Sequence, residues 1–350
     1  MSTAVYSVIP RAAGRIQETL GLLKVRPSER HYTPAVAAAK RARFYMTPVD
    51  NSRGQRAWFK ASLQDAPWLR RGLRDEISIH QAFEAYERRS RPAFDTPSFI
   101  AAGNLHSSWT WLLRKYWAGT FAGDMDDRFG LSASFLRQVS PLYLAKALAD
   151  VRRLGPFLRR RHLKFETHGL GWYLLDFHYY RRHFFSPLLG HRLNPGWTRD
   201  DIDKMEGLFL HHRSFLRQHA TVLAHGDLYP NNILVRPNGG VVLFDWELAH
   251  WNLPTFDVAL IYLLAWRHPA WQEQFLNRSL RLIGQPRLTP IAWRLSLLSL
   301  ATRLTAFCFI RLTNGQPERY PRLTAAQRRC LWPLYKIWLR HLTTAYQALP

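Results

Sequence analysis

The fold of this protein is decided by residues 223–235, which read LAHGDLYPNNILV. A polar loop, in which Asp227 and Asn232 stand five residues apart, leads into a short apolar run. The turn-forming stretch 236–240 follows, and a second apolar run then reaches Asp245. Two apolar runs around such a turn predict a β-hairpin. Pairing of its strands would bring Asn232 and Asp245 to the same end of the hairpin, beside Asp227.

These three side chains suit the transfer of a phosphoryl group. Mg²⁺ prefers hard oxygen ligands, which the carboxylate of Asp245 and the amide oxygen of Asn232 offer. A carboxylate such as Asp227 can orient and deprotonate an attacking hydroxyl. The spacing His-x-Asp-x-x-x-x-Asn from His225 is the pattern of kinase catalytic loops. The alternative is a polar turn before a hairpin, in which Asp and Asn serve only turn chemistry.

Four motifs carry a family resemblance. HGDL occupies 225–228, NIL 232–234, FDWE 244–247 and PTFDVA 254–259. In this order and spacing they resemble the aminoglycoside phosphotransferase and choline kinase family, which has a protein-kinase-like fold and phosphorylates small molecules. The glycine after the histidine, and Asp-Trp-Glu in place of Asp-Phe-Gly, favour this family over the protein kinases proper.

The resemblance implies a role for each polar residue of these motifs. Asp227 would be the catalytic base, and Asn232 and Asp245 would bind Mg²⁺. His225 would brace the loop, and Asp257 would anchor it from below. ATP and Mg²⁺ would be the cofactors.

The amino-terminal part must then supply the nucleotide lobe. Lys60 lies in a β-leaning run, from which a lysine can reach the nucleotide phosphates. Glu76 lies on the following predicted helix and would pair with Lys60, with Asp75 and Glu84 as competitors for that role. Each charge taken alone could equally be solvated. Order and separation along the chain fit the family.

Two further segments belong to the expected nucleotide lobe. Residues 111–116 resemble the last strand before the hinge, whose backbone would hold adenine. The phosphate-covering loop should fall in 32–43, but that stretch contains no glycine. Alanine allows a close backbone approach without giving positive φ as readily as glycine does. The grip on the terminal phosphate is therefore the point where this sequence departs from the family.

The element pattern predicts an α+β, bilobal, protein-kinase-like fold. The expected parts are a helical extension (1–23), a β-rich N-lobe that binds ATP (24–117), and a mainly helical C-lobe with the catalytic loop and acceptor site (118–350). The predicted elements are a hairpin of 43–49 with 56–63, a helix over 73–89, a strand over 109–117, a helix over 132–154 and a helix over 198–219 capped by Thr198.

Composition narrows the class of protein. The 350 residues carry a net charge of +24, of which +10 falls in residues 1–120. Charge spread in this way indicates a solvated surface more than a dedicated polyanion-binding tail. Two cysteines indicate a reducing compartment. The most apolar run, 291–310, is interrupted by Arg294 and Arg303 and predicts no membrane span. We expect a cytoplasmic protein, with peripheral contact at an anionic membrane or polyanion as a further option.

The sequence says least about the identity of the compound that would accept the phosphoryl group. An excess of basic residues argues against a polycationic aminoglycoside and favours a neutral or anionic sugar-like compound or a lipid headgroup. The stretch 172–185 mixes aromatic and basic residues, which could stack sugars or bases, lie on an anionic bilayer, or form an ordinary core helix with a charged outer face. The one acidic cluster is 124–127. The alternative function is a non-catalytic kinase-fold module that uses its basic surface to bind nucleic acid, membrane or protein; no specific nucleic-acid site is identified.

Overall fold

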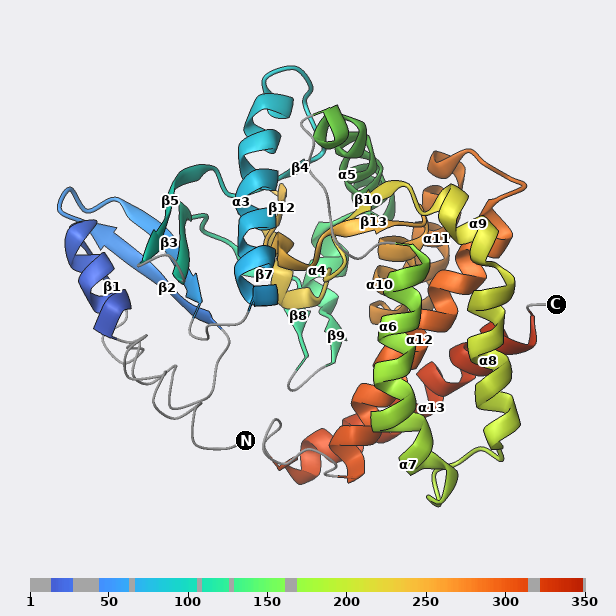
Figure 1. Ribbon diagram of the computed structural model, residues 1–350. Coiled ribbons are helices and arrows are strands. Elements are labelled where there is room, and N and C mark those ends of the chain that lie inside the picture. The colour runs from blue at the N-terminus through green and yellow to red at the C-terminus, as the bar shows by residue number, and fades with distance from the viewer. Residues whose placement is uncertain are drawn as a thin grey trace.

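The computed structural model describes residues 14–27, 44–62, 67–105, 109–125, 129–160, 169–313 and 322–348 (Figure 1). A strand-rich lobe at the left of Figure 1 adjoins a larger helical lobe at the right. The expected bilobal α+β architecture is thus confirmed. The glycine-free segment 32–43 lies outside the described residues, as do two of the residues of the acidic cluster, 126 and 127.

A five-stranded antiparallel sheet forms the N-lobe, in the order β1-β2-β3-β6-β5. Its strands are β1 (Val25–Pro27), β2 (Phe44–Asn51), β3 (Arg56–Ser62), β6 (Trp109–Lys115) and β5 (Phe99–Leu105). Strands β2 and β3 form the predicted hairpin, and their register pairs Met46 with Lys60. Residues 14–22 form a helix whose Ile16 and Leu20 are buried in the same cluster as Tyr45 and Phe59 of the sheet. This helix is therefore packed into the N-lobe core.

Helix α3 (Pro67–Glu87) connects the two lobes and begins six residues earlier than the predicted helix 73–89. Below it, the predicted hairpin is present as β11 (Ile233–Val235) and β12 (Val241–Leu243), with Ile233 opposite Leu243. The hairpin is the centre of a four-stranded sheet in the order β4-β12-β11-β7. The outer strands are β4 (Phe94–Asp95) and β7 (Thr120–Phe121).

Two further strand pairs complete the β-structure of the described residues. Strand β10 (Val222–Ala224) pairs with β13 (His250–Asn252), and β8 (Gly123–Asp124) pairs with β9 (Gly130–Leu131). The pairing of β10 with β13 brings together the two ends of the segment 225–249, which contains the hairpin.

The rest of the described chain is helical. Its helices are α4 (Ala133–Gln138), α5 (Pro141–Arg160), α6 (Leu170–Tyr180), α7 (Ser186–Leu189), α8 (Arg199–His211), α9 (Arg213–His219), α10 (Phe256–Leu264), α11 (Pro269–Ile283), α12 (Thr289–Thr313) and α13 (Ala325–Gln347). A π-helical turn at Arg181–Phe185 joins α6 to α7.

Two predicted helices are divided in the structure. The helix expected over 132–154 breaks after α4, because Pro141 has no amide hydrogen to continue it and instead opens α5. The helix expected over 198–219 is interrupted at His212, which ends α8 and precedes α9. The predicted cap is confirmed: Thr198 and Asp201 form a reciprocal capping box at the start of α8.

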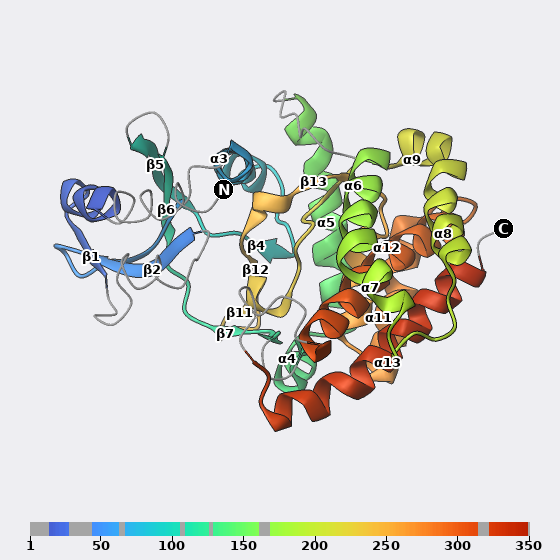
Figure 2. The ribbon, with the colours of Figure 1, turned by 60° about the horizontal axis from the view of Figure 1, so that its bottom comes forward.

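Helix α12 is the centre of the helical lobe. Figures 1 and 2 both place it between α6 and α13. It is the one described helix long and apolar enough to cross a membrane, but 89% of its apolar window is buried inside the protein. A core helix passes the same length and composition test, so α12 is weak evidence for a membrane span.

Candidate active site

The loop after β10 is held from below by Asp257, at the start of α10. The carboxylate of Asp257 accepts hydrogen bonds from the backbone amides of His225 (2.7 Å) and Gly226 (3.1 Å). Gly226 has φ +81°, and a Cβ there would clash with the carbonyl oxygen of Leu248. Only glycine suits this position. Burial raises the pKa of Asp257 to about 6, against the opposing effect of the two amides.

His225 lies against the second strand of the hairpin. Its Nε2 is 2.7 Å from the carbonyl oxygen of Phe244, and its ring centre is 4.3 Å from that of Trp246. Burial lowers the pKa of His225 to about 4. The imidazole is therefore neutral at neutral pH and donates from Nε2. The geometry connects the catalytic loop to residue 244, directly before Asp245.

Asp227 and Asn232 meet at the end of the hairpin. The side-chain amide of Asn232 donates to the backbone oxygen of Asp227 (2.8 Å) and to its Oδ2 (2.9 Å). The backbone oxygen of Asn232 accepts from the amide of Phe244 (2.9 Å). Asp245 follows at φ +64° and ψ 62°, a left-handed conformation that turns the chain out of the strand. The expected meeting of Asn232 and Asp245 at one end of the hairpin is present.

Lys60 extends from β3 of the N-lobe into the same region. Its Nζ lies 2.8 Å from Oε2 of Glu76 and 2.9 Å from Oε2 of Glu247, and it forms an ion pair with Asp245. The Lys60 side chain is 1% exposed. Burial by itself would lower the pKa of Lys60, but the carboxylates of Asp245, Glu247 and Glu76 together raise it. The lysine is therefore charged.

Glu76 is the carboxylate of α3 that pairs with Lys60. Its other oxygen accepts from Nη1 of Arg114 on β6 (2.5 Å). Burial would raise the pKa of Glu76, but Lys60 and Arg114 hold it well below its usual range. Glu84, a competitor for this role in the sequence, instead accepts from the amide of Phe99 (2.9 Å). The second competitor, Asp75, has Arg71 as its charged neighbour, and burial raises its pKa to about 6.

Glu247 is a site residue to which the sequence pattern assigned no role. Within the described ranges, Glu76, Asp245 and Glu247 form a group whose oxygens lie within 4.8 Å of one another. Burial raises the pKa of Glu247 to about 7, although Lys60 opposes this shift. Hard carboxylate oxygens at this separation fit Mg²⁺ as a ligand set. The sequence signal that could have identified Glu247 is its position two residues after Asp245.

A cavity of about 490 Å³ opens beside Asp227. Helix α6 contributes Trp172 and Asp176 to its wall, and α12 contributes Arg303. Asp176 and Arg303 were not expected here, since Arg303 had been interpreted only as a break in an apolar run. The aromatic stretch of α6 is divided: Trp172, Tyr179 and Tyr180 line the cavity, whereas Tyr173 and Phe177 lie in the core.

The fold and this site define a kinase-like phosphotransferase. Residues 132–291 match the model of a family described as "Phosphotransferase enzyme family". The match confirms the resemblance to the aminoglycoside phosphotransferase and choline kinase family. The match supports a phosphotransferase. No curated protein sequence matches the chain.

Solved structures share the fold. An aminoglycoside phosphotransferase from Alicyclobacillus acidocaldarius has a TM-score of 0.50 and 15% identity, over 87% of this chain and 89% of that one. The GDP and kanamycin complex of APH(2")-IIia has a TM-score of 0.51 and 12% identity, over 94% and 99%. The choline kinase LicA from Streptococcus pneumoniae has a TM-score of 0.49 and 13% identity, over 94% and 98%. At such identities the first two show a shared fold alone.

Proposed function

We propose that this protein transfers the γ-phosphoryl group of ATP to a hydroxyl of a small molecule, with Mg²⁺ as the metal cofactor. The observation that carries the proposal is the convergence on one lysine. Lys60 from the N-lobe sheet pairs with Glu76 of α3 and with Asp245 from beyond the hairpin. Such a convergence of the lobes is what positioning of nucleotide phosphates requires. Residues 24–117 would then bind the nucleotide, and 118–350 would carry the catalytic loop and the acceptor.

Asp227 is the proposed catalytic base. The hydrogen bond from Asn232 fixes its carboxylate, and the same carboxylate faces the cavity in which an acceptor can sit. A hydroxyl held there would lose its proton to Asp227 as it attacks the terminal phosphorus. His225 and Asp257 hold the loop backbone and do not face the acceptor.

Asp245 and Asn232 are the proposed ligands of Mg²⁺. They are the carboxylate and the amide at the open end of the hairpin, and Glu247 adds a further carboxylate within reach of Asp245. Bound Mg²⁺ would neutralise charge on the β- and γ-phosphates. Lys60, held by Glu76, is placed to contact the phosphate oxygens. Arg114 secures Glu76 from its other side, so that the carboxylate cannot turn away from the lysine.

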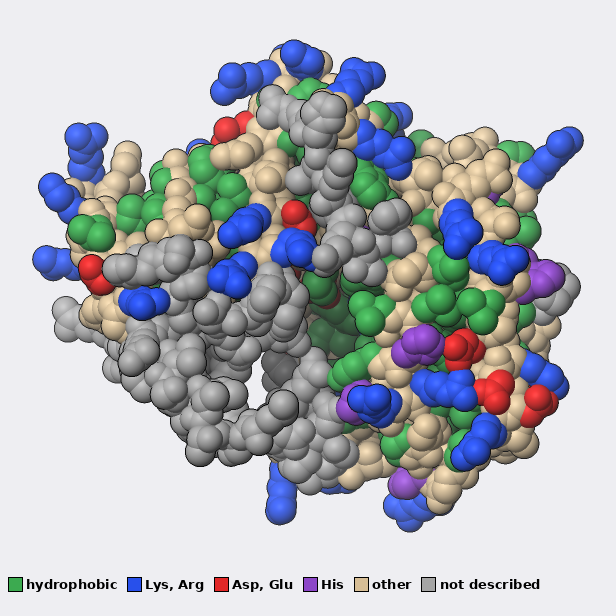
Figure 3. All heavy atoms as spheres, viewed as in Figure 1, with side chains coloured by type: hydrophobic (Ala, Val, Ile, Leu, Met, Phe, Trp, Pro, Cys, Tyr) green, Lys and Arg blue, Asp and Glu red, His purple; other side chains and the backbone are tan. Residues whose placement is uncertain are grey.

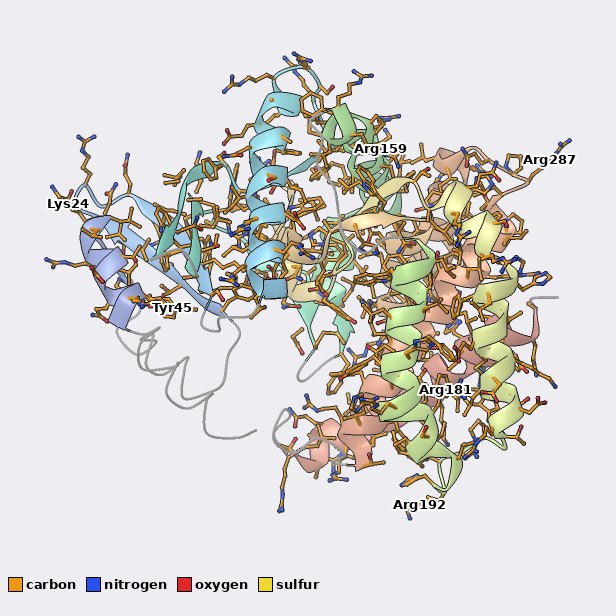
Figure 4. The ribbon with its side chains drawn as sticks, viewed as in Figure 1. Lys24, Tyr45, Arg159, Arg181, Arg192 and Arg287 are labelled. Carbon is orange, nitrogen blue, oxygen red and sulfur yellow. The ribbon has the colours of Figure 1, made fainter. Side chains whose placement is uncertain are left out.

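The proposed acceptor is a neutral or anionic sugar-like compound or lipid headgroup, in preference to a polycation. The excess of positive charge supports this choice. Figure 3 shows hydrophobic side chains beside the hollow in the middle of one face, with Lys and Arg side chains spread around the molecule. Arg159, Arg192 and Arg287 project outward in Figure 4. A spread-out charge of this kind supports a solvated surface.

The experiment is to combine purified full-length protein with Mg-ATP and a panel of hydroxyl compounds, and to measure ADP release and phosphorylated product. Acceptor-dependent ADP release that requires Mg²⁺ supports the proposal. The alternative of a binding module is tested with DNA, RNA and anionic vesicles across a salt series. A steep salt dependence of binding, together with no affinity for Mg-ATP, would replace the proposed function.

A further inference from the structure

We infer that the acceptor is a neutral polyhydroxyl ring, a sugar or a cyclitol, and that the pair Asp176–Arg303 selects it. This inference rests on the proposed function, because it concerns the cavity beside Asp227. The cavity volume of about 490 Å³ suits a compound of one or two rings. Its walls come from α6, α12 and the catalytic loop, which makes it the natural place for the attacking hydroxyl.

The pair bridges the two helices at the cavity wall. Nη2 of Arg303 lies 3.4 Å from Oδ1 of Asp176, and the two side chains are 10% and 17% exposed. Nη1 of Arg303 lies 3.5 Å from the backbone oxygen of Gly226, the residue before Asp227. Both distances are at the long end of hydrogen bonding. An acceptor hydroxyl could therefore take part in this network and shorten it.

A cationic acceptor conflicts with this arrangement. Aromatic walls and a buried carboxylate would otherwise suit an ammonium group through cation–π contact. Here the chain supplies its own cation: the Arg303 guanidinium lies 5.7 Å from the ring centre of Trp172 and pairs with Asp176. The carboxylates raise the pKa of Arg303 although burial opposes this, so its charge is permanent. A second cation beside Trp172 would meet this like charge, and the nearest carboxylate, that of Asp176, is already paired with Arg303.

An anionic acceptor meets the opposite difficulty. Three carboxylates line the cavity, those of Asp176, Asp227 and Glu247, against the single guanidinium of Arg303. Asp176 already offsets that guanidinium. An added anion would face Asp227 at the very point where its hydroxyl must approach the base.

A neutral polyhydroxyl ring uses every feature. Asp176 can accept hydrogen bonds from hydroxyl groups, and Arg303 can donate to their oxygens. The apolar face of the ring can lie on the aromatic ring of Tyr229. With one hydroxyl at Asp227, neighbouring hydroxyls would reach the pair. Asp176 and Arg303 would thus bind a second and a third hydroxyl of the same compound.

The test compares acceptors matched in size and different in charge. With wild-type protein and Mg-ATP, phosphoryl transfer is measured to glucose, ribose and myo-inositol, to protonated glucosamine and choline, and to glucuronic acid. We expect transfer to at least one neutral compound with a kcat/KM about tenfold or more above every charged compound. Transfer only to charged compounds, or to none of the neutral ones while Mg-ATP binds, overturns the inference and leaves the proposed function standing. Absence of both Mg-ATP binding and transfer refutes the proposed function itself.

Variants then assign the selection to the pair. Asp176→Asn and Arg303→Gln should raise KM for the neutral acceptor about tenfold or more, with a smaller change in kcat, because the lost hydrogen bonds are made before and during transfer. Arg303→Gln should also shift the ratio of choline to neutral-acceptor turnover toward choline. Asp203→Asn and Arg192→Gln, both on the surface, are the matched controls.

A conservative substitution distinguishes loss of folding from loss of acceptor selection. Arg303→Lys keeps the charge, so it should keep the exclusion of choline while losing affinity for the neutral acceptor, and thermal unfolding monitors the folded fraction. An unchanged KM and an unchanged charge preference in folded Asp176→Asn and Arg303→Gln proteins would overturn the role of the pair.

Discussion

The side-chain amide of Asn232 donates a 2.9 Å hydrogen bond to the carboxylate of Asp227. The same amide also bonds the backbone oxygen of Asp227 (2.8 Å), so one side chain fixes both the base and its loop. Both donor hydrogens of Asn232 are thereby used, and its amide oxygen is the atom left for a metal. The position of the proposed base Asp227 therefore depends directly on the proposed metal ligand Asn232.

Replacement of Asp227 by Asn should remove turnover and keep nucleotide binding. The neutral amide cannot take the acceptor proton, and general-base catalysis contributes about 10²–10⁴ in rate. We expect kcat to fall by that factor while the affinity for Mg-ATP changes little, measured by product formation and by calorimetry. Undiminished turnover in Asp227→Asn would eliminate Asp227 as the base.

Replacement of Asn232 should show itself in the magnesium requirement. Asn232→Ala removes both the proposed ligand and the support of Asp227, so the Mg²⁺ concentration at half-maximal activity should rise as kcat falls. The measurement is a Mg²⁺ titration at saturating ATP. The matched control is Asn238→Ala, because Asn238 stabilises only the hairpin turn through Gly240 (3.1 Å). Equal Mg²⁺ curves for both variants would contradict the assignment.

Replacement of Lys60 should destabilise the folded protein, because carboxylates that share this lysine would repel one another. Lys60→Met leaves the carboxylates of Glu76, Asp245 and Glu247 without their common cation, and a broken buried ion pair costs about 3–5 kcal/mol. The free energy of unfolding in urea, measured without Mg²⁺, should fall by that amount. Addition of Glu247→Gln to the variant should restore part of it, because one surplus charge disappears. Additive effects of the two substitutions would refute this coupling.

The sequence predicted those parts of the site whose residues lie close together along the chain. The hairpin and its loop follow from turn chemistry and from spacing within about twenty residues, so His225, Asp227, Asn232 and Asp245 could be placed together. Lys60 and Glu76 needed the family resemblance, since nothing local brings β3 to the hairpin. Their meeting is nevertheless present in the structure.

The acceptor side could not be predicted in the same way. Asp176 and Arg303 are 127 residues apart, and only the packing of α6 against α12 joins them. A lone arginine in an apolar helix looks like an interruption until its partner is known. The division of the helix expected over 132–154 has a local signal in Pro141, which lacks the amide hydrogen that would continue α4 and stands at the start of α5.

Acid should destabilise the protein through His225. Its folded-state pKa is lowered by burial to about 4, from an ordinary value of 6.5. A depressed histidine pKa stabilises the folded state fully above pH 6.5, and this contribution is lost as the pH falls from 6.5 toward 4. The structural reason is visible at the second ring nitrogen: Nδ1 of His225 has no hydrogen-bond partner within the described part of the chain, so a proton there would place an unpaired charge in the core.

The measurement is the free energy of unfolding in urea for wild type and His225→Gln as a function of pH. Glutamine can keep a donor for the carbonyl oxygen of Phe244 but does not titrate. Between neutral pH and pH 4, wild type should lose up to about 3 kcal/mol of unfolding free energy relative to the variant. This value follows from about 1.4 kcal/mol for each unit by which the folded-state pKa lies below the unfolded-state pKa. His178→Gln is the control, because His178 lies on the surface, 2.7 Å from Glu206. A stability difference between wild type and His225→Gln that stays constant with pH would show that the pKa of His225 is the same in the folded and unfolded protein, which would contradict a lowered folded-state pKa.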